Sequence, residues 1–101
     1  MIRYALSALL LLALTAPALA EEFEAVDAVD PGKFGDPKVL EIEGLQVGQT
    51  QTSAAYYRFA NEQALANCQK NALFAMAKPG RFVLVIFDRN FGDTSCKLKR
   101  R

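Results

Sequence analysis

The sequence contains no histidine and no tryptophan, and only two of its 101 residues are cysteine. Without histidine, the chain lacks the commonest general base, the usual serine and cysteine catalytic triads and most zinc sites. Its six glycines are scattered and form no phosphate-binding loop. These absences predict a protein that is not an enzyme and that holds no metal or cofactor.

Two groups of oxygen-bearing side chains are the remaining candidates for chemistry. Glu41 and Glu43 share one face of a predicted strand, as a carboxylate pair would, but an ordinary amphipathic strand has the same pattern. The segment 88–93 places Asp, Asn and Gly at alternate positions, as calcium loops do. It lacks the downstream glutamate of such loops, and tight turns select the same residues. Both groups are therefore interpreted as structural.

The first twenty residues have the pattern of a secretory signal peptide. Arg3 precedes an apolar run over 5–14, and Ala18-Leu19-Ala20 forms a cleavage motif. The alternative, a retained membrane anchor, needs about 20 apolar residues, and this run is shorter and is followed by Thr15 and Pro17. We therefore expect residues 1–20 to be removed after Ala20, which gives a periplasmic or secreted protein without stable membrane insertion.

Export determines how the two cysteines are interpreted. In an oxidising compartment, Cys68 and Cys96 are expected to form a disulfide. A redox pair is the alternative, but such pairs usually lie close together as C-x-x-C. In the chain-entropy model, this cross-link contributes about 3.6 kcal/mol of stability, which is a large share for so small a domain.

The charges of the chain are segregated along the sequence. Residues 21–43 carry eight acidic and two basic residues, whereas residues 58–101 carry nine basic and three acidic ones. Removal of Arg3 with the signal peptide leaves eleven basic residues against eleven acidic ones, so the mature chain is neutral. The two halves either pair internally or present one end to a charged partner.

Proline, glycine and acidic residues dominate residues 21–37, which are predicted to be a flexible acidic arm. Residues 38–101 are predicted to form a single domain. It begins with a strand over 39–43, in which Leu40 and Ile42 alternate with Glu41 and Glu43. A short second strand over 45–47 is expected after Gly44.

A long helix is predicted from about Ala54 to Ala77, with Thr52 or Ser53 as its N-cap and Pro79-Gly80 after its end. Helical periodicity places one set of residues on a single apolar stripe centred on Cys68. The stripe consists of Tyr57, Ala64, Leu65, Cys68, Ala72, Ala75 and Met76.

A second set of residues lies on another face of that helix and includes three aromatic side chains. The set consists of Tyr56, Phe59, Gln63, Asn67 and Phe74. Large side chains outside the apolar stripe indicate either a helix covered on both sides or a surface for a partner protein. These five residues are the candidate partner surface.

The apolar run 82–87 is predicted to be a strand covered on both faces, and residues 94–98 are predicted to pair with it as a hairpin. For the disulfide to form, Cys96 must face the helix, and Thr94 and Leu98 then face it too. The expected fold is α+β: one long helix packed on a small, mostly antiparallel sheet of order β-(β)-α-β-β, stapled by one disulfide.

The chain ends in the basic residues KLKRR, which suggest an anionic lipid, an acidic protein or simply a soluble terminus. Export argues against nucleic acid as a partner. The sequence thus favours an exported, non-enzymatic binding or accessory protein that acts through contacts with another exported or envelope protein. The alternative is a self-associating structural or stress-related envelope protein, and a small hydrolase or redox enzyme is less favoured.

Overall fold

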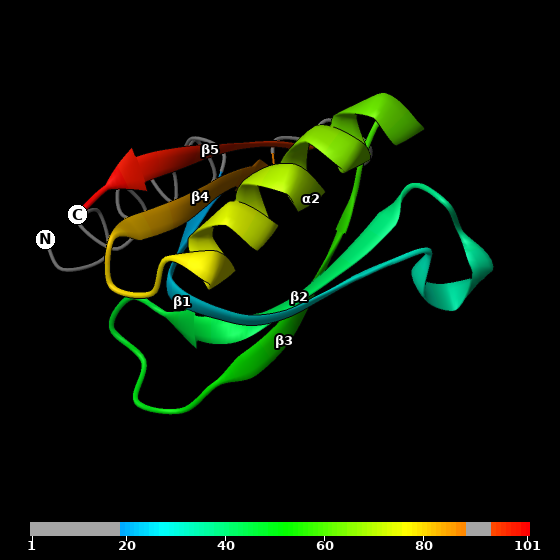
Figure 1. Ribbon diagram of the computed structural model, residues 1–101. Helices are drawn as coiled ribbons and strands as arrows, with labels where there is room; N and C mark the ends of the chain where they lie inside the picture. Colours follow the sequence, from blue (N-terminus) through cyan, green and yellow to red (C-terminus); the bar gives the residue numbers. More distant parts are fainter. Residues whose placement is uncertain (1–18, 89–93) are drawn as a thin grey trace, which may run out of the picture.

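The computed structural model of the chain describes residues 19–88 and 94–101. Five strands and one α-helix make up this part, together with a single 3-10 turn (Figure 1). In chain order they are β1 (Leu19–Pro31), η1 (Lys33–Gly35), β2 (Val39–Gln46), β3 (Ser53–Arg58), α2 (Glu62–Ala77), β4 (Phe82–Asp88) and β5 (Thr94–Arg100).

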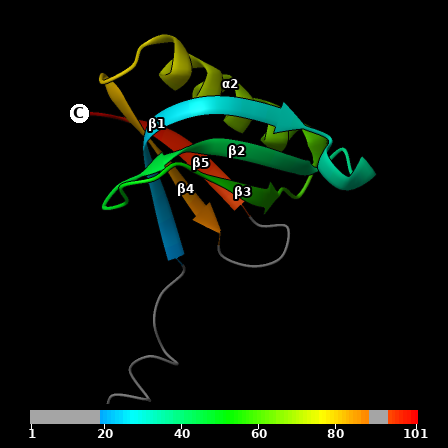
Figure 2. The same cartoon turned by 90° about the horizontal axis from the view of Figure 1, so that it is seen from below.

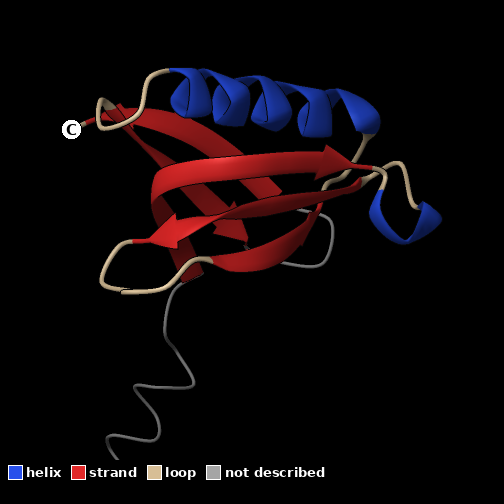
Figure 3. Ribbon diagram, turned by 60° about the horizontal axis from the view of Figure 1, so that its bottom comes forward, coloured by secondary structure: helices blue, strands red, loops and turns tan. Residues whose placement is uncertain are grey.

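The strands form one antiparallel sheet in the order β3-β2-β1-β4-β5. Strands β1 to β3 follow one another as hairpins, and β4 returns through the helix to lie beside β1, which is the Greek-key arrangement. The two edge strands approach each other where the Thr94 hydroxyl donates a hydrogen bond to the Arg58 carbonyl (2.6 Å). The sheet therefore curls into a partly open barrel, and α2 packs across one side of it (Figures 2 and 3).

The fold class is confirmed: one helix packs on a five-stranded antiparallel sheet. The prediction of a flexible arm is wrong for residues 21–31, because they belong to β1, the central strand. Register shifts between Phe23 and Ala25 and between Val26 and Ala28 break the alternation of the strand. These bulges place both Phe23 and Val26 in the core, three positions apart, and so hide the period-two pattern in the sequence.

The predicted helix begins eight residues too early. Residues Ser53–Arg58 form β3, which pairs with β2, and the helix starts at Glu62 after the N-cap Asn61. The Asn61 side chain accepts a hydrogen bond from the backbone N–H of Ala64 (2.8 Å). Pairing of the Tyr56-Tyr57 segment with β2 overrides the helix propensity of the neighbouring alanines.

The apolar stripe of the helix is confirmed for its central members. Leu65, Cys68, Ala72 and Ala75 are buried, whereas Met76 is exposed and Tyr57 reaches the same core from β3. Cys68 and Cys96 form the disulfide, with their Cα atoms 5.4 Å apart. This bond joins the buried face of α2 to β5.

The predicted C-terminal hairpin is also confirmed, since β4 and β5 pair antiparallel. Thr94 is buried and Leu98 packs against the core, so both lie on the helix side together with Cys96. Three consecutive residues of β4, Leu84 to Ile86, are buried, as expected for a strand covered on both faces.

The segregated charges pair across the sheet. Lys99 lies 3.8 Å from the Glu22 carboxylate, and Arg101 lies 3.6 Å from that of Glu24. Both acidic residues lie on β1, and both basic residues lie on or directly after β5. Each pair therefore reaches across β4, which lies between these two strands. The interpretation that the acidic and basic halves pair internally is thus confirmed for these residues.

A buried hydrogen bond fixes the start of β1. The Tyr57 hydroxyl donates to the Glu21 carboxylate, and the phenol ring is almost fully buried. Burial and this hydrogen bond raise the pKa of Tyr57 far above its ordinary value. The neutral phenol is therefore the form that the folded state holds.

We expect the Cys68→Ala/Cys96→Ala double variant to lose about 3 to 4 kcal/mol of unfolding free energy, because it loses the loop constraint and a buried contact. Urea denaturation of the oxidised protein, the reduced protein and the variant measures this loss. A reduced protein with two titratable thiols and an unchanged denaturation midpoint would contradict the structural role of the disulfide.

We expect the stability of the protein to fall in alkaline solution. Above pH 10, the unfolded Tyr57 ionises while the folded one stays protonated, so at pH 11 about 1.4 kcal/mol of stability is lost through this group. Tyr57→Phe should cost about 1 kcal/mol at neutral pH through the lost hydrogen bond and should lose less stability between pH 9 and pH 11. Tyr56→Phe is the comparison variant: because the pKa of Tyr56 is also raised, it should remove part of the alkaline loss, but less than Tyr57→Phe, since Tyr56 is exposed and Tyr57 is buried. An alkaline loss removed mainly by Tyr56→Phe would overturn the assignment.

Candidate functional site

The five residues predicted as a partner surface do not lie together. Phe59 is only 1% exposed and belongs to the core, where its backbone N–H bonds the carbonyl of Lys38 (2.9 Å). Tyr56 lies on β3 and points away from the core, since its strand neighbour Tyr57 points inward. The predicted surface is therefore wrong as a unit, because it assumed that residues 54–61 continue the helix.

The other three members do lie on the outer face of α2. Gln63 donates a hydrogen bond to Asn67 one turn later (3.2 Å). Phe74 is 44% exposed and packs one edge against Phe82 of β4, with ring centroids 5.2 Å apart. The helix thus presents polar side chains in its first half and an aromatic one near its end.

Tyr56 instead belongs to a cluster around the β1–β2 connection, which projects beyond the sheet (Figure 1). Phe34 in η1 is 76% exposed, and its ring lies 5.0 Å from that of Tyr56. Asp30, Lys33 and Glu41 surround the two rings. We name these five residues, Asp30, Lys33, Phe34, Glu41 and Tyr56, the acidic aromatic cluster.

The backbone at the tip of this connection is unusual. Phe34 has φ 59° and ψ 24°, a left-handed conformation that costs a residue with a side chain about 1 to 2 kcal/mol. Gly32 and Gly35, on either side of it, also have positive φ. The connection is closed by hydrogen bonds from Gly32 N–H to Val39 O (2.9 Å) and from Val39 N–H to Asp36 O (3.1 Å). These bonds hold the Phe34 ring outward.

Polar contacts organise the rest of the cluster. The Lys33 ammonium lies 3.3 Å from Asp30 and 3.6 Å from Glu41. The hydrogen bond to Asp30 is the main cause that raises the pKa of Lys33. A hydrogen bond with Glu41 likewise raises the pKa of Tyr56. The cluster thus combines two exposed rings with two carboxylates that pair with Lys33.

A shallow pocket of about 400 Å³ lies on the other side of the same connection. Its lining includes Pro31, Gly32 and Pro37 from the connection and Glu62, Leu65 and Ala66 from the start of α2. The projecting connection therefore offers apolar surface on both sides, which suits contact with a larger molecule better than enclosure of a small one.

The carboxylates of Glu41 and Glu43, the candidate catalytic pair, have the surroundings of an ordinary amphipathic strand. Glu41 and Glu43 lie on the outer face of β2 while Leu40 and Ile42 are buried, and Glu41 pairs with Lys33. Asn90, Gly92 and Asp93 of the calcium-like segment lie outside the described residues. Within residues 19–88 and 94–101, no group of three or more metal-ligating side chains occurs.

Sequence reasoning missed Phe34. The signal was present as an aromatic residue between two glycines, in Gly32-Lys33-Phe34-Gly35, but assigning residues 21–37 to a flexible arm hid it.

Among the residues described, no helix is long and apolar enough to cross a membrane. Comparison of the chain with protein-family models, with curated proteins and with solved structures finds no match.

Proposed function

We propose that the chain is an exported, non-enzymatic binding protein that uses the acidic aromatic cluster to contact another exported or envelope protein. The observation that carries this proposal is the exposure of the Phe34 side chain. The ring contacts Tyr56 but stays 76% exposed on a strained backbone, so most of its apolar surface is left for a contact outside the chain. Aromatic side chains on a pre-ordered loop are typical anchors of protein interfaces.

The charges and the exposed ring of the cluster indicate which kind of partner surface would complement it. Four acidic residues lie on this face against two cations, Lys33 and Arg58, so the face is acidic. Lys33 pairs with Asp30 and Glu41, Arg58 pairs with Asp36 (3.5 Å), and Glu43 is exposed. A complementary surface would offer a pocket for the Phe34 ring, with basic groups at its rim. The absence of histidine and the structural environment of Glu41 leave catalysis out of the proposal.

Export rests on the sequence of residues 1–20, and the strand register is compatible with it. Leu19 and Ala20 pair with Asp88 and Phe87, whereas Glu21 to Phe23 pair with Ile86 to Leu84. Cleavage after Ala20 would remove only the first two pairs and keep the Glu21 carboxylate that accepts from Tyr57.

We expect the chain expressed with residues 1–20 to be recovered outside the cytoplasm as a shorter product that begins at Glu21. Intact-mass measurement and N-terminal sequencing check this, with Ala18→Lys/Ala20→Lys as the variant that blocks cleavage. A full-length product that stays in the cytoplasm would contradict export.

We expect the Phe34→Gly variant to retain its stability, because glycine accepts the positive φ, and to lose partner capture from the native envelope. The measurement compares cross-linked captures by the wild-type protein, Phe34→Gly, Tyr56→Ser and the control Val47→Ser. Val47 is 50% exposed on the β2–β3 loop, away from the cluster. A partner captured equally by all four proteins would contradict the assigned surface.

Self-association through β3 is the second candidate. This edge strand carries a charge only at its end, on Arg58, whereas the other edge strand, β5, carries Lys97 and Lys99. Charged side chains on an edge discourage pairing with another sheet, so β3 is the less protected edge. The same capture distinguishes the two candidates, since recovery of this chain alone would identify self-association.

A further inference from the structure

The end of the molecule opposite the acidic aromatic cluster has a different character. From Asn67 to Phe87, every charged residue is basic: Lys70, Lys78 and Arg81. Two large apolar side chains lie among them, Leu73 at 43% exposure and Phe74. The Lys78 ammonium lies 5.5 Å from the centre of the Phe74 ring.

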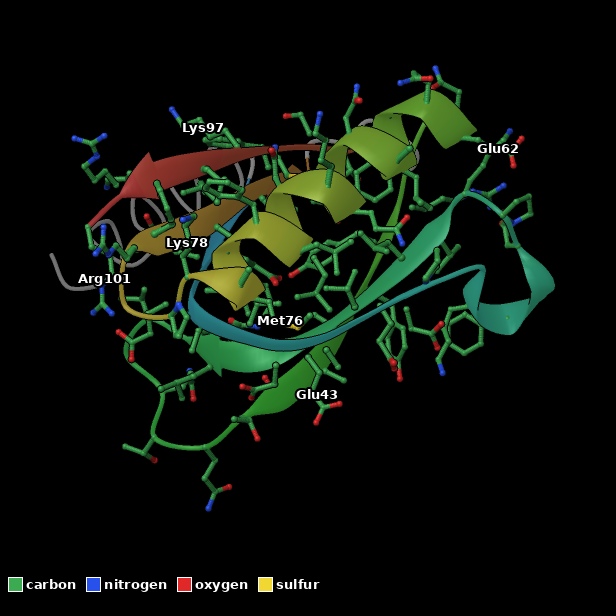
Figure 4. All side chains as sticks on the ribbon, viewed as in Figure 1. Glu43, Glu62, Met76, Lys78, Lys97 and Arg101 are labelled. Atoms are coloured by element: carbon green, nitrogen blue, oxygen red, sulfur yellow. A yellow bond between two sulfur atoms is a disulfide. The ribbon has the colours of Figure 1, made fainter. Side chains whose placement is uncertain are left out.

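The end of β5 adds to this surface. Arg100 pairs in register with Phe82, which itself contacts Phe74, and so brings another cation beside the aromatic pair. Figure 4 places Lys78 and Arg101 toward the end of the molecule where α2 finishes, and Glu62 at the opposite end of the helix. We name Lys70, Leu73, Phe74, Lys78, Arg81 and Arg100 the basic apolar end.

A hollow opens within this end. It measures about 450 Å³ and is lined by Gly80, Arg81, Phe82, Arg100 and Arg101. Arg101 is partly neutralised by Glu24 at 3.6 Å. No described ion pair engages Arg81 or Arg100 within residues 19–88 and 94–101. Two guanidinium groups thus border a space open to an oxyanion, and guanidinium matches phosphate oxygens in geometry.

We propose that the basic apolar end docks on an anionic phospholipid surface, with a lipid phosphate in the hollow and Leu73 and Phe74 at the boundary of the acyl chains. Charge complementarity supports lipid, because four exposed cations, Lys70, Lys78, Arg81 and Arg100, share this end with two exposed apolar side chains. An acidic protein would need a groove for those side chains. Leu73 and Phe74 are exposed side chains of α2, and a deformable bilayer can accommodate them without a preformed groove.

The test is sedimentation of the expected mature chain, which begins at Glu21, with lipid vesicles. This chain keeps β1 from Glu21 onward and all later elements, and it omits the apolar run that would itself enter lipid. We expect binding to phosphatidylglycerol vesicles, little binding to phosphatidylcholine vesicles, and weaker binding at high salt. Arg81→Gln/Arg100→Gln should weaken binding about 30-fold, since each basic residue near an anionic surface contributes about five-fold. Leu73→Gln should weaken it about five-fold.

Matched controls remove equal charge or apolar surface elsewhere. Lys38→Gln/Arg58→Gln and Val47→Gln should bind within two-fold of wild type, and circular dichroism checks that every variant is folded. Equal loss in the control pair would show unspecific attraction and would overturn the site. Absence of binding to phosphatidylglycerol vesicles would overturn the proposal too. So would a combination of two results: inorganic phosphate or soluble polyglutamate at matched charge displaces the protein from the vesicles, and Leu73→Gln leaves vesicle binding unchanged. None of these outcomes bears on partner capture by the acidic aromatic cluster.

Discussion

The simultaneous pairing of β1 with β2 and β4 is the constraint on which the rest of the structure depends. It joins the two hairpins of the chain into one curled sheet. Its two bulges turn Phe23 and Val26 into the same core and bend the strand. Gly44 makes this bend possible, because a Cβ at that position would collide with the Ala25 carbonyl. A side chain at Gly44 would force the two strands apart beside the bulge.

Once β1 is in place, the helix and the disulfide close the domain. The buried face of α2 uses small residues, Cys68, Ala72 and Ala75, so the helix lies close to the sheet. So small a core leaves a thin margin of stability, and the link from Cys68 to Cys96 holds the helix on β5. A rigid domain also keeps its exposed side chains in place, which lowers the entropy lost on binding.

Much of the fold was predictable because its signals are local. The β4 run, the β4–β5 hairpin and the stripe around Cys68 each follow from short-range periodicity. The central role of β1 was not predictable, because its bulges break the alternation and its neighbours are distant in sequence. The helix start failed for a related reason, since the residues before Asn61 favour a helix locally and become a strand only through pairing with β2. The predicted partner surface was wrong for the same reason. Tyr56 is indeed exposed, but it lies on β3 beside Phe34 and not on the helix beside Phe74.

The positions of the charges give two regions of the molecule opposite electrostatic character. Lys99 pairs with Glu22 and Arg101 with Glu24, and such exposed pairs contribute little stability. Their effect is to leave the remaining acidic groups around Phe34 and the remaining cations around Phe74. The β1–β2 connection, which carries Phe34, and the C-terminal end of α2, which carries Phe74, lie on opposite sides of the molecule (Figure 1). The two proposed contacts, with a basic protein and with an anionic surface, are assigned to these two different regions, so neither contact would cover the other.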